Sequence, residues 1–167
     1  VYKNPDDLQA RQEMHHASCL AGLAFSNAGL GLNHGMAHTL GAHFHIPHGR
    51  ANGILLPYVM AFNAGCHEQL TPVAARYARI ARVLRLDGPS IRQSAFSVVR
   101  TTKQYMKQLH IPDSIEAAGV SREDFDAVLD EMVEAAYQDA CTKTNPRACS
   151  KEDIRGVFLR AYTGRLI

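Results

Sequence analysis

Helix signals dominate the pattern of hydrophobic and polar positions, and no stretch shows the sustained β-branched alternation expected of a strand. The pattern therefore predicts an all-α fold. The first helix is expected to begin at Asn4, with Pro5 in its first turn, and to continue through Phe25 until Gly29 ends it. Further helices are expected over residues 32–42, 50–63, 71–84, 89–109, 121–140 and 150–162.

Proline and glycine mark the boundaries of these helices. Residues 45–49 are expected to form a turn, because Pro47 disfavours helix in the residue before it and has no amide proton to donate. Pro57 is expected to kink or end the third helix, and Gly65 to cap it. Two pairs resemble capping boxes, Ser121 with Asp124 and Ser150 with Asp153. Without a repeat or a flexible linker, residues 1–167 are expected to form one helical domain.

Composition removes several classes of function. The chain is 46% hydrophobic and 20% charged with a formal charge of +2, and its sequence shows no clustered Lys/Arg face, so we expect no nucleic-acid partner. Its four cysteines have no CxxC spacing and are expected to be reduced thiols of a cytoplasmic protein. No apolar run approaches the ~20 residues of a membrane span, so no membrane association is expected.

Histidine is unusually dense in one segment, which holds five of the nine histidines between His34 and His48. His34 and His38 are four residues apart, so both rings project from one helix face, and His48 can fold back toward them after the turn. Neutral imidazoles in such a cluster suit zinc or iron. A stable site normally needs three or four protein ligands, so the residues alone predict an incomplete metal site.

The same segment carries a family resemblance. Residues 31–42, GLNHGMAHTLGA, and residues 47–52, PHGRAN, resemble the signature of the iron-containing (group III) alcohol dehydrogenases. Residues 21–27, AGLAFSN, and residues 139–147, DACTKTNPR, are similar to other segments of that family. The resemblance covers nearly the whole chain. It implies the multi-helix C-terminal domain of a dehydroquinate-synthase-like fold, which follows an N-terminal nucleotide-binding domain.

The resemblance also implies a role for individual residues. His34 and His48 match two ligands of the catalytic metal, Fe²⁺ or alternatively Zn²⁺. His38 matches a histidine close to the nicotinamide that is a candidate for proton relay, and so is expected to be both catalytic and cofactor-binding. Phe25 matches an aromatic position beside the nicotinamide ring, and Cys141 matches a residue that lines the substrate pocket.

Two features that the resemblance implies are missing from the sequence. The family's other metal ligands come from a D-x-x-x-H helix, and its coenzyme binds at a glycine-rich turn; the chain contains neither. We therefore expect the chain to be the metal-carrying fragment of a longer, two-domain NAD- or NADP-dependent alcohol dehydrogenase. Such an enzyme interconverts primary alcohols or diols and aldehydes, and a homo-oligomer is expected. On its own the fragment is expected to be inactive.

Two other interpretations stay open at the level of the sequence. One is a glycerol-dehydrogenase-like or dehydroquinate-synthase-like metalloenzyme domain within the same superfamily. The other is a free-standing helical module that binds metal or drives oligomerisation and has no catalysis of its own. The module would have to complete its metal site from this chain or from symmetry-related copies, and the missing Asp and His ligands argue against that.

Overall fold

The computed structural model describes residues 1–166 and contains helices but no β-strand in that range, as the all-α prediction requires. The elements run in the order α1 (Leu8–Ala28), α2 (Gly31–Phe44), α3 (His48–Ala64), α4 (Val73–Val83), α5 (Ile91–Gln108), η1 (Glu116–Ala118), α6 (Arg122–Gln138), η2 (Thr142–Thr144) and α7 (Lys151–Thr163). None of the described helices combines the length and the apolar character needed to cross a bilayer.

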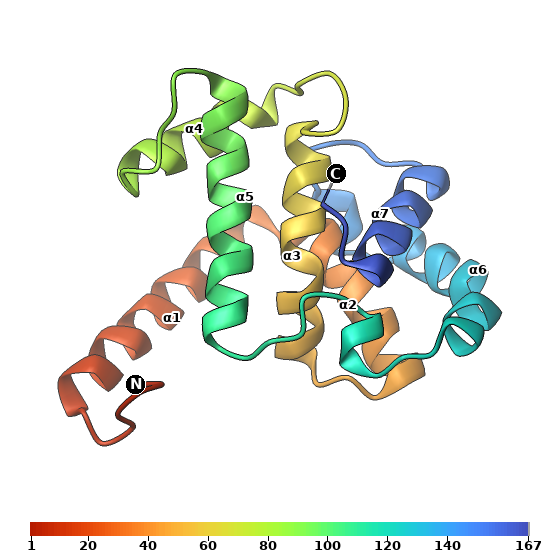
Figure 1. Ribbon diagram of the computed structural model, residues 1–167, viewed down its shortest axis with the longest axis horizontal. Helices are drawn as coiled ribbons and strands as arrows, with labels where there is room; N and C mark the ends of the chain where they lie inside the picture. Colours follow the sequence, from red (N-terminus) through yellow and green to blue (C-terminus); the bar gives the residue numbers. More distant parts are fainter. Residues whose placement is uncertain (167) are drawn as a thin grey trace.

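The core forms around α2 and α3, which pack against each other near the centre of the molecule (Figure 1). Helix α6 packs on α2, α7 packs on α3 and α6, and the α4–α5 pair adjoins the far side of α3. The largest side chains that are fully buried are Tyr58, Phe125 and Phe158, from α3, α6 and α7. Apolar burial between these helices is the main favourable term in their folding.

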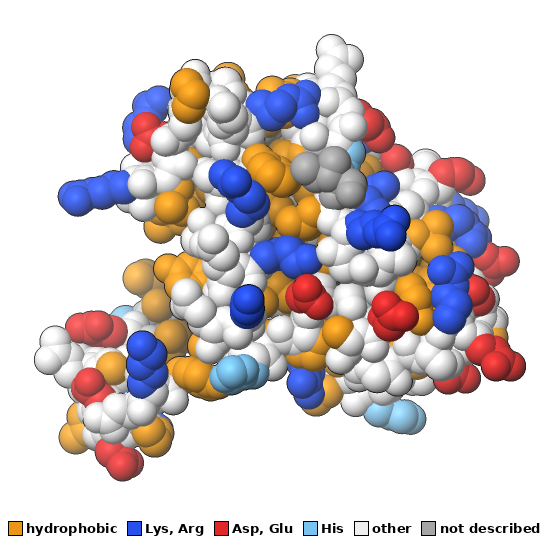
Figure 2. Space-filling view, in the orientation of Figure 1, with side chains coloured by type: hydrophobic (Ala, Val, Ile, Leu, Met, Phe, Trp, Pro, Cys, Tyr) orange, Lys and Arg blue, Asp and Glu red, His pale blue; other side chains and the backbone are white. Residues whose placement is uncertain are grey.

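Helix α1 differs from the others because none of its residues is buried. It extends away from the other helices at the lower left of Figure 1, and Figure 2 shows apolar side chains over that arm. The predicted start of this helix was wrong. Asn4 instead accepts a hydrogen bond from the Asp6 amide in a preceding turn, and the Asp7 carboxylate caps α1 by accepting from the Ala10 amide at 3.0 Å.

Proline acts differently at its two positions around α3. Pro47 precedes the helix, which therefore begins at His48 rather than at residue 50. Pro57, by contrast, does not end the helix, which runs on to Ala64 before Gly65 caps it in the left-handed conformation as predicted. Leu55 and Tyr58, on either side of Pro57, are fully buried, so packing holds both halves of the helix in place.

The C-terminal end of α6 sets the geometry of the site. This helix was expected to reach residue 140, but it ends at Gln138, and Asp139 takes an extended conformation. The turn that follows carries Thr142, whose hydroxyl donates to the Ala136 carbonyl at 2.7 Å. Thr142 lies directly against Gly35 of α2, where a Cβ would overlap its Oγ1. A glycine at this position thus allows the loop after α6 to approach the histidine-bearing helix.

Both predicted serine caps are present. Ser150 and Asp153 form a complete capping box at the start of α7. Ser121 accepts from the Asp124 amide at 3.1 Å, but its hydroxyl also donates to the Asp124 carboxylate, which therefore does not complete a reciprocal box.

Candidate functional site

Three histidines from helices α2 and α3 come together. His34 and His38 lie one turn apart on α2, with ring centroids 6.2 Å apart. The chain then reverses: His45 is left-handed at φ 54° and its amide bonds to the Gly41 carbonyl. Pro47 follows, and His48 opens α3 with its ring centroid 5.2 Å from that of His34. The predicted return of His48 toward the first two histidines is thus observed.

The pair formed by His34 and His48 suits a shared metal ion. Two imidazoles that bind one ion at about 2.1 Å in tetrahedral geometry hold their ring centres about 5 Å apart, close to the separation seen here. Burial lowers the pKa of His34, and nearby His48 and His38 lower it further, against an opposite contribution from Asp139. His34 is therefore held as the neutral imidazole, the form that ligates metals.

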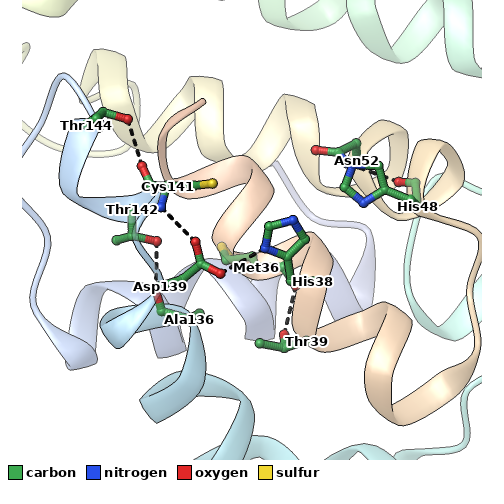
Figure 3. A network of polar contacts seen from close by, with 10 residues as sticks. All are labelled: Met36, His38, Thr39, His48, Asn52, Ala136, Asp139, Cys141, Thr142 and Thr144. Carbon is green, nitrogen blue, oxygen red and sulfur yellow. Dashed lines mark hydrogen bonds and ion pairs between the residues drawn. The ribbon is translucent and has the colours of Figure 1, made fainter. Parts of the chain in front are cut away.

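His38 is placed differently from this pair. Its ring is stacked on that of His48, with centroids 5.4 Å apart and an interplanar angle of 18°. Because nitrogen lone pairs lie in the plane of the ring, two stacked, nearly parallel imidazoles are poorly arranged to share one ion. The His38 Nδ1 instead lies 2.8 Å from Asp139 Oδ2, and 44% of the His38 side chain is exposed (Figure 3).

Asp139 is the residue at this site that sequence reasoning missed. Burial acts to raise the pKa of its carboxyl, but hydrogen bonds from His38 and from the Cys141 amide outweigh burial and lower it overall. The Cys141 amide donates to Asp139 Oδ1 at 2.7 Å. The only sequence signal was the position of Asp139 two residues before Cys141 in a family-like segment, and 101 residues separate it from His38.

Two asparagines form a hydrogen-bonded chain that ends at His48. The Asn52 side-chain amide lies 3.2 Å from His48 Nε2 and donates to the His48 carbonyl at 3.0 Å (Figure 3). Asn33 of α2 donates in turn to Asn52 Oδ1 at 2.8 Å. Both asparagines belong to the segments that carried the resemblance, but nothing in those segments indicated this role.

The two remaining predicted site residues, Phe25 and Cys141, take no part in the ring contacts of the three histidines within residues 1–166. Phe25 lies near the end of α1 with 46% of its surface exposed. Cys141 lies in the turn after α6 and is partly buried. Burial raises the pKa of the Cys141 thiol, and the neighbouring Asp139 raises it further, so the free thiol is protonated and is not an activated nucleophile.

The chain was compared with known proteins. It matches the sequence model of the Fe-containing alcohol dehydrogenase family, C-terminal, over residues 1–162. An NADPH-dependent butanol dehydrogenase from Clostridium saccharobutylicum is 42% identical over 158 residues, which make up 95% of this chain and 39% of that protein. A 1-propanol dehydrogenase from Salmonella typhimurium is 41% identical over 90% of this chain and 40% of its own length.

Solved structures give the same result. An alcohol dehydrogenase from Oenococcus oeni superimposes with a TM-score of 0.84 at 38% identity, covering 95% of this chain and 39% of that one. An iron-containing alcohol dehydrogenase from Thermococcus thioreducens gives 0.82 at 35% identity with the same coverage. The chain thus spans about two fifths of the length of the relatives it matches. It belongs to the Fe-containing alcohol dehydrogenase family and has the all-helical fold of that family's C-terminal domain.

Proposed function

We propose that this chain is the metal-carrying part of an NAD- or NADP-dependent alcohol dehydrogenase that interconverts primary alcohols or diols and aldehydes. The observation that carries the proposal is the 5.2 Å separation of the His34 and His48 rings, which suits two ligands of one ion. Relatives named as butanol and 1-propanol dehydrogenases support the substrate class.

His34 and His48 would hold Fe²⁺, or alternatively Zn²⁺, and further ligands would come from a segment outside this chain. When bound, the metal supplies Lewis-acid polarisation of the alcohol or carbonyl oxygen, and the nicotinamide coenzyme accepts or donates hydride. The protein's own contribution here is to keep His34 neutral through burial and to fix the His48 ring through Asn52. Ligands held in this way need little reorganisation when the ion binds.

His38 would relay the substrate proton to solvent. In this proposal the ionised Asp139 accepts the Nδ1–H of His38, and this fixes the tautomer in which Nε2 is free to take the proton. Because 44% of the His38 side chain is exposed, a proton received at Nε2 can pass on to water. Asp139 acts through His38 and is therefore a positioning residue.

Phe25 and Cys141 would contact the coenzyme and the substrate. Phe25 would lie against the nicotinamide ring, and Cys141 would form part of the wall of the alcohol pocket. The exposed apolar side chains of α1 support a nucleotide-binding domain as the partner of this chain, because that helix leaves Leu8, Met14, Leu20 and Leu23 more than half exposed. An apolar helix that the other helices of its chain leave unpacked is typical of a segment covered by another element.

The test is a chimaera that joins this chain to the preceding part of the Clostridium saccharobutylicum butanol dehydrogenase. We expect it to hold about one iron ion per chain and to oxidise primary alcohols, with the isolated chain retaining little iron. His34→Ala should abolish iron retention and activity in the chimaera, whereas His43→Ala on the same helix should preserve both. A His34→Ala chimaera that keeps its iron and its activity would contradict the proposal. Stoichiometric iron in the isolated chain would favour the independent metal-binding module.

A further inference from the structure

A second group of metal-binding side chains lies on the opposite side of His38 from His48. A ring nitrogen of His38, a carboxylate oxygen of Asp139 and the Cys141 sulfur all lie within 4.8 Å of one another. Figure 3 shows Asp139 and Cys141 together on one side of the His38 ring, with His48 and Asn52 on the other. These three side chains supply one nitrogen, one oxygen and one sulfur ligand.

The fold holds this group in place through short-range hydrogen bonds. The Cys141 amide is fixed to Asp139 Oδ1 at 2.7 Å, and the Cys141 carbonyl accepts from the Thr144 hydroxyl at 2.8 Å. Thr142, between them, is tied to the end of α6 and lies against Gly35. The loop that carries two of the ligands is thus braced against the helix that carries the third, so little ordering is left for an ion to impose.

We propose that His38, Asp139 and Cys141 form a second metal site that binds Zn²⁺ and is separate from the His34–His48 pair. Zinc accepts this mixture of ligands, and a thiolate favours it over magnesium, calcium or manganese. Zinc bonds of about 2.0–2.3 Å place tetrahedral ligands about 3.3–3.7 Å apart. The donor atoms are at most 4.8 Å apart at present, so their separations have to change by only about 1 Å. Water takes the fourth position.

Binding has a defined proton balance. The Cys141 S–H bond breaks, the sulfur keeps the electron pair that it donates to zinc, and the thiol proton passes to solvent. The nitrogen of His38 that faces Asp139 must offer a lone pair, so the ring proton of the neutral imidazole moves to the other nitrogen. The hydrogen bond between His38 and Asp139 is replaced by a bond from each residue to the ion. No electron is transferred, and no co-reactant is needed.

The site is open to ions in solution. The side chains of His38 and Asp139 are 44% and 21% exposed, so a hydrated ion can reach them without unfolding. The stacking of His38 on His48 does not obstruct binding, because it involves the face of the ring whereas the ligand nitrogen lies at its edge. The inference needs neither His34 nor His48. Zinc bound here would replace the hydrogen bond between His38 and Asp139 on which the proposed proton relay depends, so the zinc-bound state and the relay state of His38 exclude each other.

Cobalt titration of the reduced chain tests the site directly. Co²⁺ takes the place of zinc and gives a near-ultraviolet sulfur-to-metal charge-transfer band only when a thiolate is a ligand. We expect this band in the unmodified chain, its displacement by Zn²⁺, and its loss in Cys141→Ser. The matched controls Cys149→Ser and Cys19→Ser should keep it. His38→Gln and Asp139→Asn should each weaken binding about tenfold or more, with circular dichroism confirming that each variant is folded.

Two results would overturn the proposal: no thiolate band in the unmodified chain, or a band that survives Cys141→Ser. Variants of the other pair separate this site from the proposed catalytic one. His34→Gln and His48→Gln should leave the thiolate band and its midpoint unchanged, and loss of the band in these variants would mean that there is one merged site. The failure of either proposal is therefore visible without reference to the other.

Discussion

Helices α1 and α3 are both long, at 21 and 17 residues, but α3 is packed in the core and α1 is not. Helix α3 buries eleven residues, whereas α1 buries none. Leu20 and Leu23 of α1 are 66% and 61% exposed, whereas Ile54 and Leu55 of α3 are fully buried. An apolar side chain contributes to stability only when another element removes it from water. Apolar composition therefore predicted both helices, but it did not predict which of them would be packed.

The largest expected effect is a difference between equivalent leucines in the two helices. Leu55→Ala in α3 should lower the free energy of unfolding by about 2–5 kcal/mol, because it leaves a cavity in the core. Leu20→Ala in α1 should change it by less than about 0.5 kcal/mol. Urea unfolding followed by circular dichroism measures both. Equal losses would show that α1 is packed in solution and would break the comparison.

Two glycines of α2 differ in how closely a neighbouring element approaches them, so their alanine variants extend the comparison to the packed region. Gly35→Ala should cost about 1–3 kcal/mol, because its Cβ overlaps Thr142 Oγ1 and pushes away the loop that carries Asp139. Gly41→Ala makes only an ordinary contact, 3.5 Å from the Ile46 carbonyl, and should stabilise the helix by up to about 1 kcal/mol. Opposite signs in denaturant unfolding are expected. Stabilisation by both alanines would rule out the close approach of the loop to α2.

Helix caps give a smaller effect that also depends on packing. Ser150→Ala removes the cap of α7, which is packed on α3 and α6, and should cost about 1 kcal/mol of global stability. Asp7→Ala removes an equivalent cap from α1 but should leave the global unfolding midpoint unchanged, with faster hydrogen exchange confined to the first turn of that helix. A shift of the global unfolding midpoint in Asp7→Ala would show that α1 unfolds together with the core.

The smallest effect is a pH dependence from His67, which lies just after α3. Burial lowers the pKa of His67 from its usual 6.5, Arg160 lowers it further, and Glu68 acts in the opposite direction. The folded state then binds fewer protons than the unfolded state, so stability is full above pH 6.5 and falls as the pH drops through the folded pKa. His67→Gln should reduce the stability lost between about pH 7.5 and about pH 5.5.

The matched control for this measurement is His16→Gln, which removes an imidazole from a helix that buries none of its residues. The folded environment of His67 supports the sign of the effect, because its Nε2 is buried and has no hydrogen-bond partner among residues 1–166. A chain that becomes more stable as the pH falls, and loses that gain in His67→Gln, would reverse the assignment.

Much of the fold could be predicted from the sequence because its signals are local. The serines at 121 and 150 and the glycine at 65 mark helix ends through hydrogen bonds within one turn, and all three mark boundaries in the structure. Packing decided where a local preference left two outcomes open. Pro57 does not end α3, which runs past it as the expected range of residues 50–63 requires, and Leu55 and Tyr58 close to it are fully buried.

In the candidate site, too, contacts between residues close in sequence could be predicted, whereas contacts between distant residues could not. The spacing of His34 and His38 and the turn before His48 were sufficient to predict that these three residues would meet, because they lie within fifteen residues of one another. The contact between His38 and Asp139 could not be predicted. It depends on α6 ending at Gln138 and on Gly35 admitting the following loop, and neither has a signal in the sequence around His38.

Local sequence patterns were therefore sufficient to predict the helices, three of their caps, the family and the histidine cluster, all of which follow from residues close together along the chain. The position of α1 outside the core and the meeting of Asp139 and Cys141 with His38 follow from helix packing alone. These contacts link segments about a hundred residues apart, and such pairings depend on how whole helices pack rather than on the preferences of any short stretch.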